Sequence, residues 1–117
     1  MALRNDTNSM ISPYVLPGLP LGYGATCAHI AVKVAEYHEM DIEQLKKHNR
    51  QKKFVEPRQI AMCIMISKGV TLKDISRYFD LDHTTVMSAR KRIGDLIDTE
   101  PVFKDRYNKV KEYALFD

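Results

Sequence analysis

The sequence lacks any apolar run long enough to cross a membrane, since a spanning helix needs roughly 20 consecutive apolar residues and no run here approaches that length. The first ten residues, MALRNDTNSM, lack the basic stretch followed by an apolar stretch that marks a secretory signal. The two cysteines, Cys27 and Cys63, form no C-x-x-C pair. We therefore expect reduced, buried thiols in a cytoplasmic protein, because disulfides belong to oxidising compartments.

Motifs for nucleotides, metals and catalysis are also missing. The stretch GLPLGYGAT lacks the Gly-Lys-Ser/Thr ending that grips phosphates and Mg²⁺. The four histidines show neither H-x-x-x-H spacing nor cysteine partners at zinc spacing. No nucleophile signature and no carboxylate pair in an evident cleft is present. We therefore expect a protein that is not an enzyme and needs no metal, nucleotide or other cofactor.

Charge is distributed unevenly along the chain, whose net charge is +3. Residues 46–93 contain twelve Lys or Arg against four acidic residues, a net charge of +8, whereas residues 30–45 carry −3 and residues 94–117 carry −2. A merely solvated lysine-rich surface would scatter these charges more evenly. The pattern predicts one positive face, as in proteins that bind polyanions.

The chain divides into two regions of different composition. Residues 1–25 are rich in Pro and Gly and show no helical or alternating apolar period, which predicts an N-terminal arm. Residues 26–117 predict a single all-α domain, a helical bundle of about five to six helices. Thr26 is expected to cap a first helix with Tyr37 on its apolar stripe.

Start and stop signals place the following helices. Asp41 with Gln44, and Thr71 with Asp74, are spaced as capping boxes that open two short helices. Between them, Pro57 suits the first position of a helix that Gly69 would end. A longer helix over about 82–97 and a last helix after residue 101 complete the series.

The short helix from Thr71, a tight turn at 80–81 and the longer helix predict a helix-turn-helix, whose second helix enters the major groove of DNA. The residues DHTTV at the start of that second helix are a poor helix opening, because β-branched side chains lose rotamer freedom there. Helical spacing assigns two opposite faces. The outer face holds Thr84, Thr85, Ser88, Lys91 and Arg92, and the inner face holds Val86, Ala89, Ile93 and Leu96.

These residue types suit base recognition. Asp82 can accept a hydrogen bond from cytosine, His83 can bond guanine or phosphate, and the threonines can contact thymine methyls. The alternative is that Asp82 and Thr84 only cap the helix and that His83 is incidental. Capping leaves the β-branched run unexplained, and such local conflicts are typical of functional sites. The basic stretch KKHNRQKK is either a solvated loop or an element that tracks phosphates or enters a minor groove.

The stretches VAEYHEMDIEQLKKHNRQKKFVEPRQIAM and LKDISRYFDLDHTTVMSARKRI closely resemble the C-terminal DNA-binding domain of the bacterial DnaA replication initiators. The resemblance covers about residues 30–97. It implies an all-helical, Trp-repressor-like helix-turn-helix fold that recognises double-stranded DNA at short asymmetric sites, the DnaA boxes. It also implies a cytoplasmic, nucleoid-associated protein with a role in transcription or replication control.

The resemblance assigns roles to particular residues. It implies that Asp82, His83, Thr84 and Thr85 read the major groove and that an arginine of the basic loop, here Arg50, enters the adjacent minor groove. Arg58 and Gln59 would add contacts to backbone and bases. With the residues of suitable charge and position, the predicted DNA-binding set is Arg50, Lys52, Lys53, Arg58, Gln59, Lys68, Asp82, His83, Thr84, Thr85, Ser88, Lys91 and Arg92.

The sequence departs from the family pattern at two places, and both affect which DNA sequence we expect it to prefer more than whether it binds DNA. The turn in FDLDHTT is one residue shorter than is common and carries an additional acid, Asp80. A family lysine falls at Ile66 or Ser67, so that Lys68 replaces it only roughly. No ATPase region precedes the domain in this sequence, which predicts a stand-alone binding module, host- or phage-encoded.

Two alternatives stay open. Either the chain reads DNA, or it retains the fold as a protein-interaction module. The N-terminal arm or the last helix, with its aromatic stripe of Phe103, Tyr107, Tyr113 and Phe116, could contact a protein partner or a second copy, although core packing is the ordinary explanation for that stripe.

Overall fold

The computed structural model describes residues 23–48 and 50–115, and all regular elements in these ranges are helices. They are α1 (Tyr23–Tyr37), α2 (Ile42–Lys46), α3 (Lys52–Ser67), α4 (Leu72–Phe79), α5 (His83–Thr99) and α6 (Pro101–Leu115). The all-α prediction and the expected number of helices are confirmed. No helix in this part of the chain is both long and apolar enough to span a bilayer.

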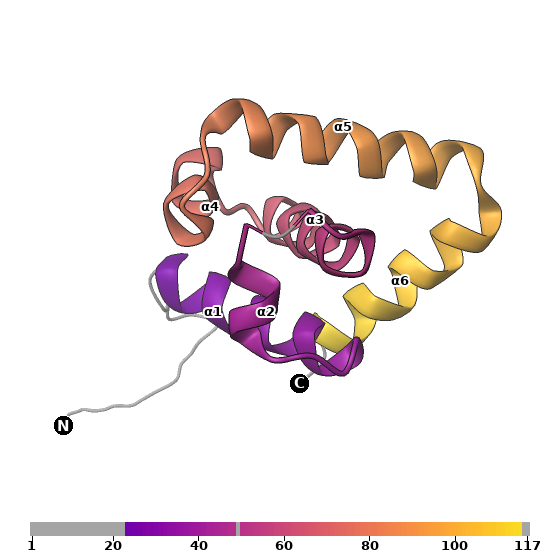
Figure 1. Ribbon diagram of the computed structural model, residues 1–117. Coiled ribbons are helices and arrows are strands. Elements are labelled where there is room, and N and C mark those ends of the chain that lie inside the picture. The colour runs from indigo at the N-terminus through magenta and orange to yellow at the C-terminus, as the bar shows by residue number, and fades with distance from the viewer. Residues whose placement is uncertain (1–22, 49, 116–117) are drawn as a thin grey trace, which may run out of the picture.

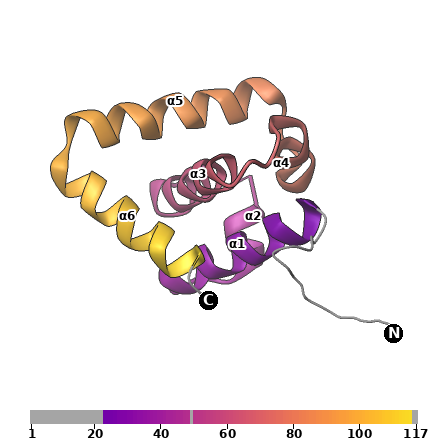
Figure 2. The same cartoon turned by 180° about the vertical axis from the view of Figure 1, so that it is seen from behind.

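Helix α3 is the centre of the fold. It lies between α5 on one side and α1 and α2 on the other, while α4 and α6 close the two ends of the bundle (Figure 1). The view from behind shows the same arrangement, with α6 joining the end of α5 back to α1 (Figure 2). Because α3 contacts α1, α2, α4 and α5, it positions the helix-turn-helix relative to the rest of the domain.

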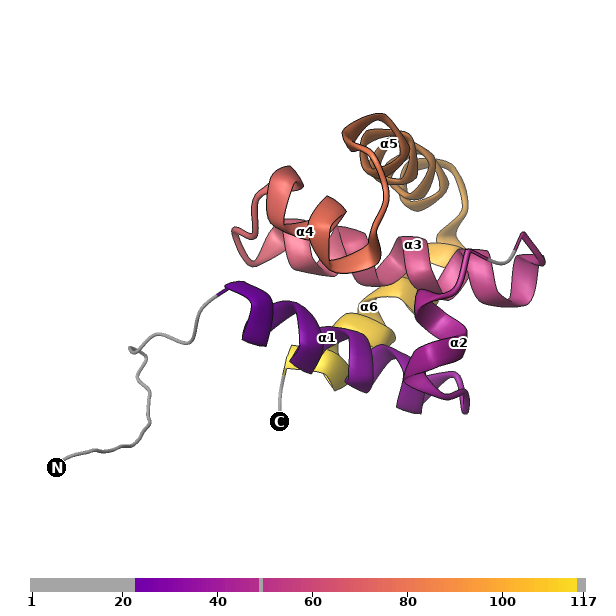
Figure 3. The ribbon, with the colours of Figure 1, turned by 60° about the vertical axis from the view of Figure 1, so that its left-hand side comes forward.

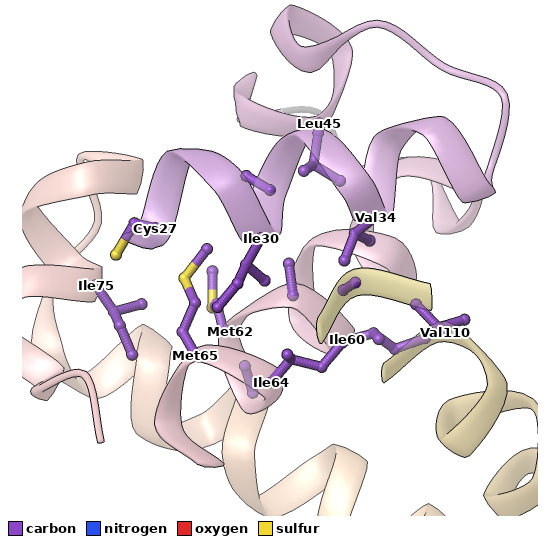
Figure 4. Close-up of a cluster of buried hydrophobic side chains, with 14 of the residues drawn as sticks. Cys27, Ile30, Val34, Leu45, Ile60, Met62, Ile64, Met65, Ile75 and Val110 are labelled. Carbon is purple, nitrogen blue, oxygen red and sulfur yellow. The ribbon is translucent and has the colours of Figure 1, made fainter. Parts of the chain in front are cut away.

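The core forms where the apolar faces of these helices meet around α3. Figure 4 shows side chains from α1, α2, α4 and α6 converging on Ile60, Met62, Ile64 and Met65 of α3. Each of these four α3 side chains is at most 1% exposed. Burial of this kind contributes about 1.5–3 kcal/mol per large apolar side chain, and it fixes the helices in one arrangement.

The capping signals predict two helix starts correctly. Asp41 and Gln44 form a complete capping box, in which the Asp41 N–H donates to Gln44 Oε1 at 2.9 Å. Thr71 Oγ1 accepts from the Asp74 N–H at 3.1 Å at the start of α4. Gly69, with φ +89°, lies just after α3 in the left-handed conformation that glycine adopts without strain.

Three boundary predictions are wrong. Helix α1 begins at Tyr23, so Thr26 lies inside it and does not cap it. Helix α3 begins at Lys52, so Pro57 is an interior residue, tolerated because its ring is buried and only one intrahelical hydrogen bond is lost. Helix α5 continues to Thr99, two residues beyond the expected end.

Tyr37 and Tyr113 depart from the expected core. Both are partly exposed, at 37% and 43%, and they contact each other edge to face with ring centroids 5.6 Å apart. Phe103 and Tyr107 are buried, as predicted for the inner face of α6. The predicted arm falls mostly on residues 1–22, and Phe116 is at the C-terminus; both lie outside the described residues.

Both cysteines are free thiols, as expected. Cys27 is fully buried, and Cys63 is largely buried beside the Ala89 carbonyl of α5. Desolvation raises the pKa of Cys63 to about 11, so its thiol stays protonated and unreactive at neutral pH.

Candidate nucleic-acid interface

The helix-turn-helix consists of α4, a turn at residues 80–82, and α5. Asp80 adopts the left-handed conformation with φ 56°. The Leu81 N–H donates to Ser76 O at 2.9 Å and the Asp80 N–H donates to Arg77 O at 3.3 Å, which is the Schellman pattern that ends a helix. This closure redirects the chain within three residues, so that α5 begins directly beside the end of α4.

Asp82 opens the second helix as its N-cap. Its carboxylate Oδ1 accepts from the Thr85 N–H at 2.8 Å, which satisfies one of the free donors of the first turn. Hydrogen bonds from Thr85, first from its side chain and then from its backbone, lower the pKa of the Asp82 carboxyl. The cap stabilises the first turn of α5 but gives no reason for β-branched residues there, and a contact of Asp82 with a base stays a prediction.

The two faces of α5 lie as helical spacing predicts. Val86, Ala89 and Ile93 are at most 1% exposed and pack into the core. The outer face is exposed at Thr84, Thr85, Ser88, Lys91 and Arg92, and His83 is exposed at the first turn. The start of α5 therefore faces solvent and not the hydrophobic interior.

Two of the outer-face cations already have partners within the protein. Lys91 Nζ lies 3.2 Å from Asp95 Oδ2, one turn further along α5. Arg92 Nη1 donates to Gln59 Oε1 of α3 at 2.9 Å. The latter contact brings two residues of the predicted set together across helices, because Gln59 lies where α3 passes beneath α5.

The basic loop is residues 47–51 between α2 and α3, and its described part lies beside the turn of the helix-turn-helix at His48. His48 Nε2 is 3.1 Å from the carbonyl oxygen of Phe79, the last residue of α4. Next to it, Lys46 Nζ lies 4.2 Å from the centre of the Tyr78 ring. Figure 3 shows α5 nearly end-on above α3, with α4 beside them and the loop entering the N-terminal end of α3. Arg50, Lys52 and Lys53 are exposed there.

Arg58 differs from the rest of the predicted set. It is only 7% exposed, and its guanidinium donates from Nε to Leu45 O at 2.9 Å and from Nη2 to Lys47 O. Desolvation lowers its pKa. Most of the Arg58 guanidinium is thus engaged by the carbonyls at the end of α2, and its predicted contact with DNA stays a prediction.

Lys68 is separated from the basic loop. It follows the last residue of α3, whereas Lys52 begins the same 16-residue helix, so the two ends lie about 24 Å apart. Lys68 is exposed. The structure thus places the predicted cations at both ends of α3 and does not gather them into one cluster.

Sequence reasoning placed Lys46 and His48 in the basic stretch but missed their contacts with α4, and it did not assign Arg90. His48 contacts Phe79 and Lys46 contacts Tyr78 of α4, and no local pattern signals contacts between residues more than 30 positions apart. Arg90 is exposed on α5 between the two assigned faces. The sequence gives the charge of Arg90 and its position on the helix, but only the structure shows that no other described helix covers this side of α5.

The family model described as the bacterial DnaA protein helix-turn-helix matches residues 27–93. The chain belongs to the bacterial DnaA family. The match includes α2, α3, α4 and the first part of α5, and therefore covers the basic loop, the turn and the outer face of α5. A helix-turn-helix is a unit whose second helix enters the major groove of DNA in the proteins that use it for binding.

Relatives of known name support the same assignment. The chain is 36% identical over 91 residues to the chromosomal replication initiator protein DnaA of Wolbachia sp. subsp. Brugia malayi, with 74% of this chain and 19% of the relative covered. It is 39% identical over 80 residues to DnaA of Latilactobacillus sakei, covering 67% of this chain and 18% of that protein. The chain thus spans about a fifth of the length of these DnaA relatives.

A solved structure has the same fold. The crystal structure of a DNA replication initiation factor superposes with a TM-score of 0.73 at 26% sequence identity, covering 80% of this chain and 29% of the other. The DnaA-like, Trp-repressor-type helix-turn-helix expected from the sequence is therefore confirmed as the fold of this chain.

Proposed function

We propose that this DnaA-family chain binds double-stranded DNA in a sequence-specific manner, with the first turn of α5 in the major groove. The observation that carries the proposal is the exposed polar start of α5 beside the basic loop. Thr84, Thr85 and His83 project into solvent from a helix whose opposite face is buried, and the His48–Phe79 contact holds the loop next to that helix start.

The charges of the described residues support a duplex as the partner. Arg50, Lys52 and Lys53 lie at one edge of this surface, and Arg90, Lys91 and Arg92 lie along α5. A B-DNA major groove admits one helix, and the phosphates on either side of it attract such cations. Arg50 is the residue that we assign to an adjacent minor groove, since arginine suits the negative potential of a narrow A·T tract.

Selection of bound oligonucleotides from a random duplex pool tests the proposal. We expect the wild-type protein to enrich one short motif. Thr85→Ala and His83→Ala should each relax preference at one base pair by about 1–3 kcal/mol, because one base-edge contact is lost. Arg50→Ala should instead weaken binding mainly to motifs with A·T-rich flanks.

Thr99→Ala is the matched control. Thr99 is an exposed threonine on the same helix, but it lies at the opposite end and its hydroxyl donates to Asp95 O at 2.8 Å. Its removal should leave the motif unchanged. Equal binding of every duplex by wild type and by the variants would refute the readout and would favour a protein-interaction module that keeps the fold.

The biological setting follows from the family. We propose that the chain acts on the bacterial nucleoid, in the cytoplasm, and controls replication or transcription from its binding sites. Its partner is duplex DNA; nothing in the proposed role needs a nucleotide, a metal or catalysis by this domain.

A further inference from the structure

A side chain of the basic loop contacts the end of the first helix of the helix-turn-helix. His48 lies in the loop, and its ring Nε2 is 3.1 Å from the oxygen of Phe79. A carbonyl oxygen can only accept, so the ring nitrogen donates. The Phe79 carbonyl is one of the last four of α4, which have no partner within the helix and carry the negative end of the helix dipole. A histidine N–H is therefore a fitting cap for that carbonyl.

Two further contacts restrain the same segment. On one side of His48, the buried Arg58 guanidinium binds the carbonyls of Leu45 and Lys47 and so fixes the direction in which the loop leaves α2. Lys46 lies over the Tyr78 ring of α4. On the other side, the loop reaches α3 at Lys52, only four residues after His48. Arg50 is two residues from His48 and two residues from the start of α3. The His48–Phe79 contact therefore limits the positions that the Arg50 backbone can reach.

We infer that His48 is a positioning residue, which fixes the basic loop against the end of α4 so that Arg50 and the first turn of α5 meet one duplex in a fixed register. This inference rests on the proposed function. Its physical basis is preorganisation: a loop that is already held in the bound geometry loses less conformational entropy when DNA binds. Without the contact, the loop around Arg50 must become ordered when DNA binds, and this entropy cost reduces the net free energy that the Arg50 contact contributes.

A direct contact of His48 with a phosphate is the competing explanation, and the two differ in what they require. Positioning needs an N–H donor aimed at Phe79 O and needs no charge. A phosphate contact benefits from a positive charge. His48→Gln supplies an amide donor without a charge, whereas His48→Ala removes both.

The test measures duplex affinity for the selected motif in a double-mutant design. Arg50→Ala and Thr85→Ala are each introduced into the wild type, into His48→Ala and into His48→Gln. We expect Arg50→Ala to weaken binding by roughly 10-fold in the wild type and by only about 2-fold in His48→Ala, because contacts that act as one unit are not additive. The loss caused by Thr85→Ala should be the same in all three backgrounds.

His48→Gln should restore most of the Arg50 effect. His29→Ala is the matched control: His29 is an exposed histidine on α1, and its removal should change neither affinity nor coupling. His48→Ala removes a hydrogen bond at the end of α4, so it should unfold at a slightly lower temperature than the wild type, and thermal unfolding verifies that every variant is folded under the conditions of the binding assay.

The outcomes separate the two proposals. An Arg50→Ala loss of equal size in the wild type and in His48→Ala, or a His48→Gln variant that behaves like His48→Ala, overturns the positioning role alone, provided that the wild type reads its motif. A wild type that binds no duplex overturns the proposed function, and this inference with it.

Discussion

At the scale of single residues, Arg58 is a buried cation whose visible partners lie within the protein. Its Nε and Nη2 donate to two carbonyls at the end of α2, where the helix leaves acceptors unpaired. An arginine suits this place because its planar guanidinium donates in two directions at once and its weak hydration makes burial less costly than for lysine. Arg58 therefore fixes the start of the basic loop.

This role predicts a stability effect. Arg58→Met keeps the apolar stem but removes both hydrogen bonds, and we expect the free energy of unfolding in urea to fall by about 2–3 kcal/mol. Arg58→Lys should recover part of the loss. Arg50→Met, at an exposed site, should change stability by less than about 0.5 kcal/mol. If Arg58 were chiefly a DNA contact, Arg58→Met would instead leave stability unchanged and weaken only duplex binding.

The same residue marks the limit of what the sequence could predict about the site. The exposed outer face of α5 followed from 3.6-residue periodicity, since Val86, Ala89 and Ile93 had to be inward. The burial of Arg58 and the contact of His48 depend on where α2 and α4 end relative to α3. Those are tertiary distances that local patterns do not encode.

At the scale of elements, α5 carries basic side chains towards its N-terminal end and acidic side chains towards its C-terminal end. His83, Arg90, Lys91 and Arg92 all precede Ile93, whereas Asp95 and Asp98 follow it and Glu100 comes directly after the helix. Phosphates attract the part before Ile93 and repel the part after it. Only the N-terminal part of the helix can therefore lie deep in a groove, with the acidic end directed away from the duplex.

The turns at the ends of α1 and α4 give a matched pair of substitutions. Glu39 and Asp80 both have φ 56°, a conformation that glycine adopts without strain. Asp80→Gly and Glu39→Gly should each raise the free energy of unfolding by up to about 1 kcal/mol. Asp80→Gly also removes an acid beside the start of α5 and should strengthen duplex binding roughly 2–5-fold at low salt.

Thermal unfolding and duplex titration separate the two effects. Glu39→Gly should be stabilising with a smaller change in affinity, because Glu39 lies in the turn between α1 and α2 and not in the helix-turn-helix. An Asp80→Gly variant that is stabilised but binds DNA no more tightly would show that this turn stays away from the phosphates.

Element positions were predictable wherever a cap was present, and less so elsewhere. Asp41 and Thr71 set two helix starts through contacts within three residues. Pro57 misled the prediction, because a proline can be kept inside a helix when the core gains more from its burial than the missing hydrogen bond costs. Tyr37 was expected inward, but the position of α6 leaves it at the edge.

At the scale of the whole molecule, the basic middle of the sequence places exposed cations on the basic loop and on α5, which we assign to DNA, whereas Lys68 lies apart from them. If six to ten phosphates are contacted, the logarithm of the duplex binding constant should fall with the logarithm of salt concentration with a slope of about −5 to −9. Titrations at several salt concentrations measure this slope. Removal of a phosphate contact by Lys52→Ala should reduce its magnitude by about one, and a slope near zero would contradict the interface.

Both anchors of the basic loop end on main-chain oxygens: Arg58 on those of Leu45 and Lys47, and His48 on that of Phe79. A main-chain oxygen survives every replacement of the side chain to which it belongs. Mutational drift at positions 45, 47 and 79 therefore cannot delete an acceptor, and only the two donors must be retained. Substitutions at Arg50 or Thr85 can therefore change the preferred DNA sequence, while the hydrogen bonds that position the basic loop are kept.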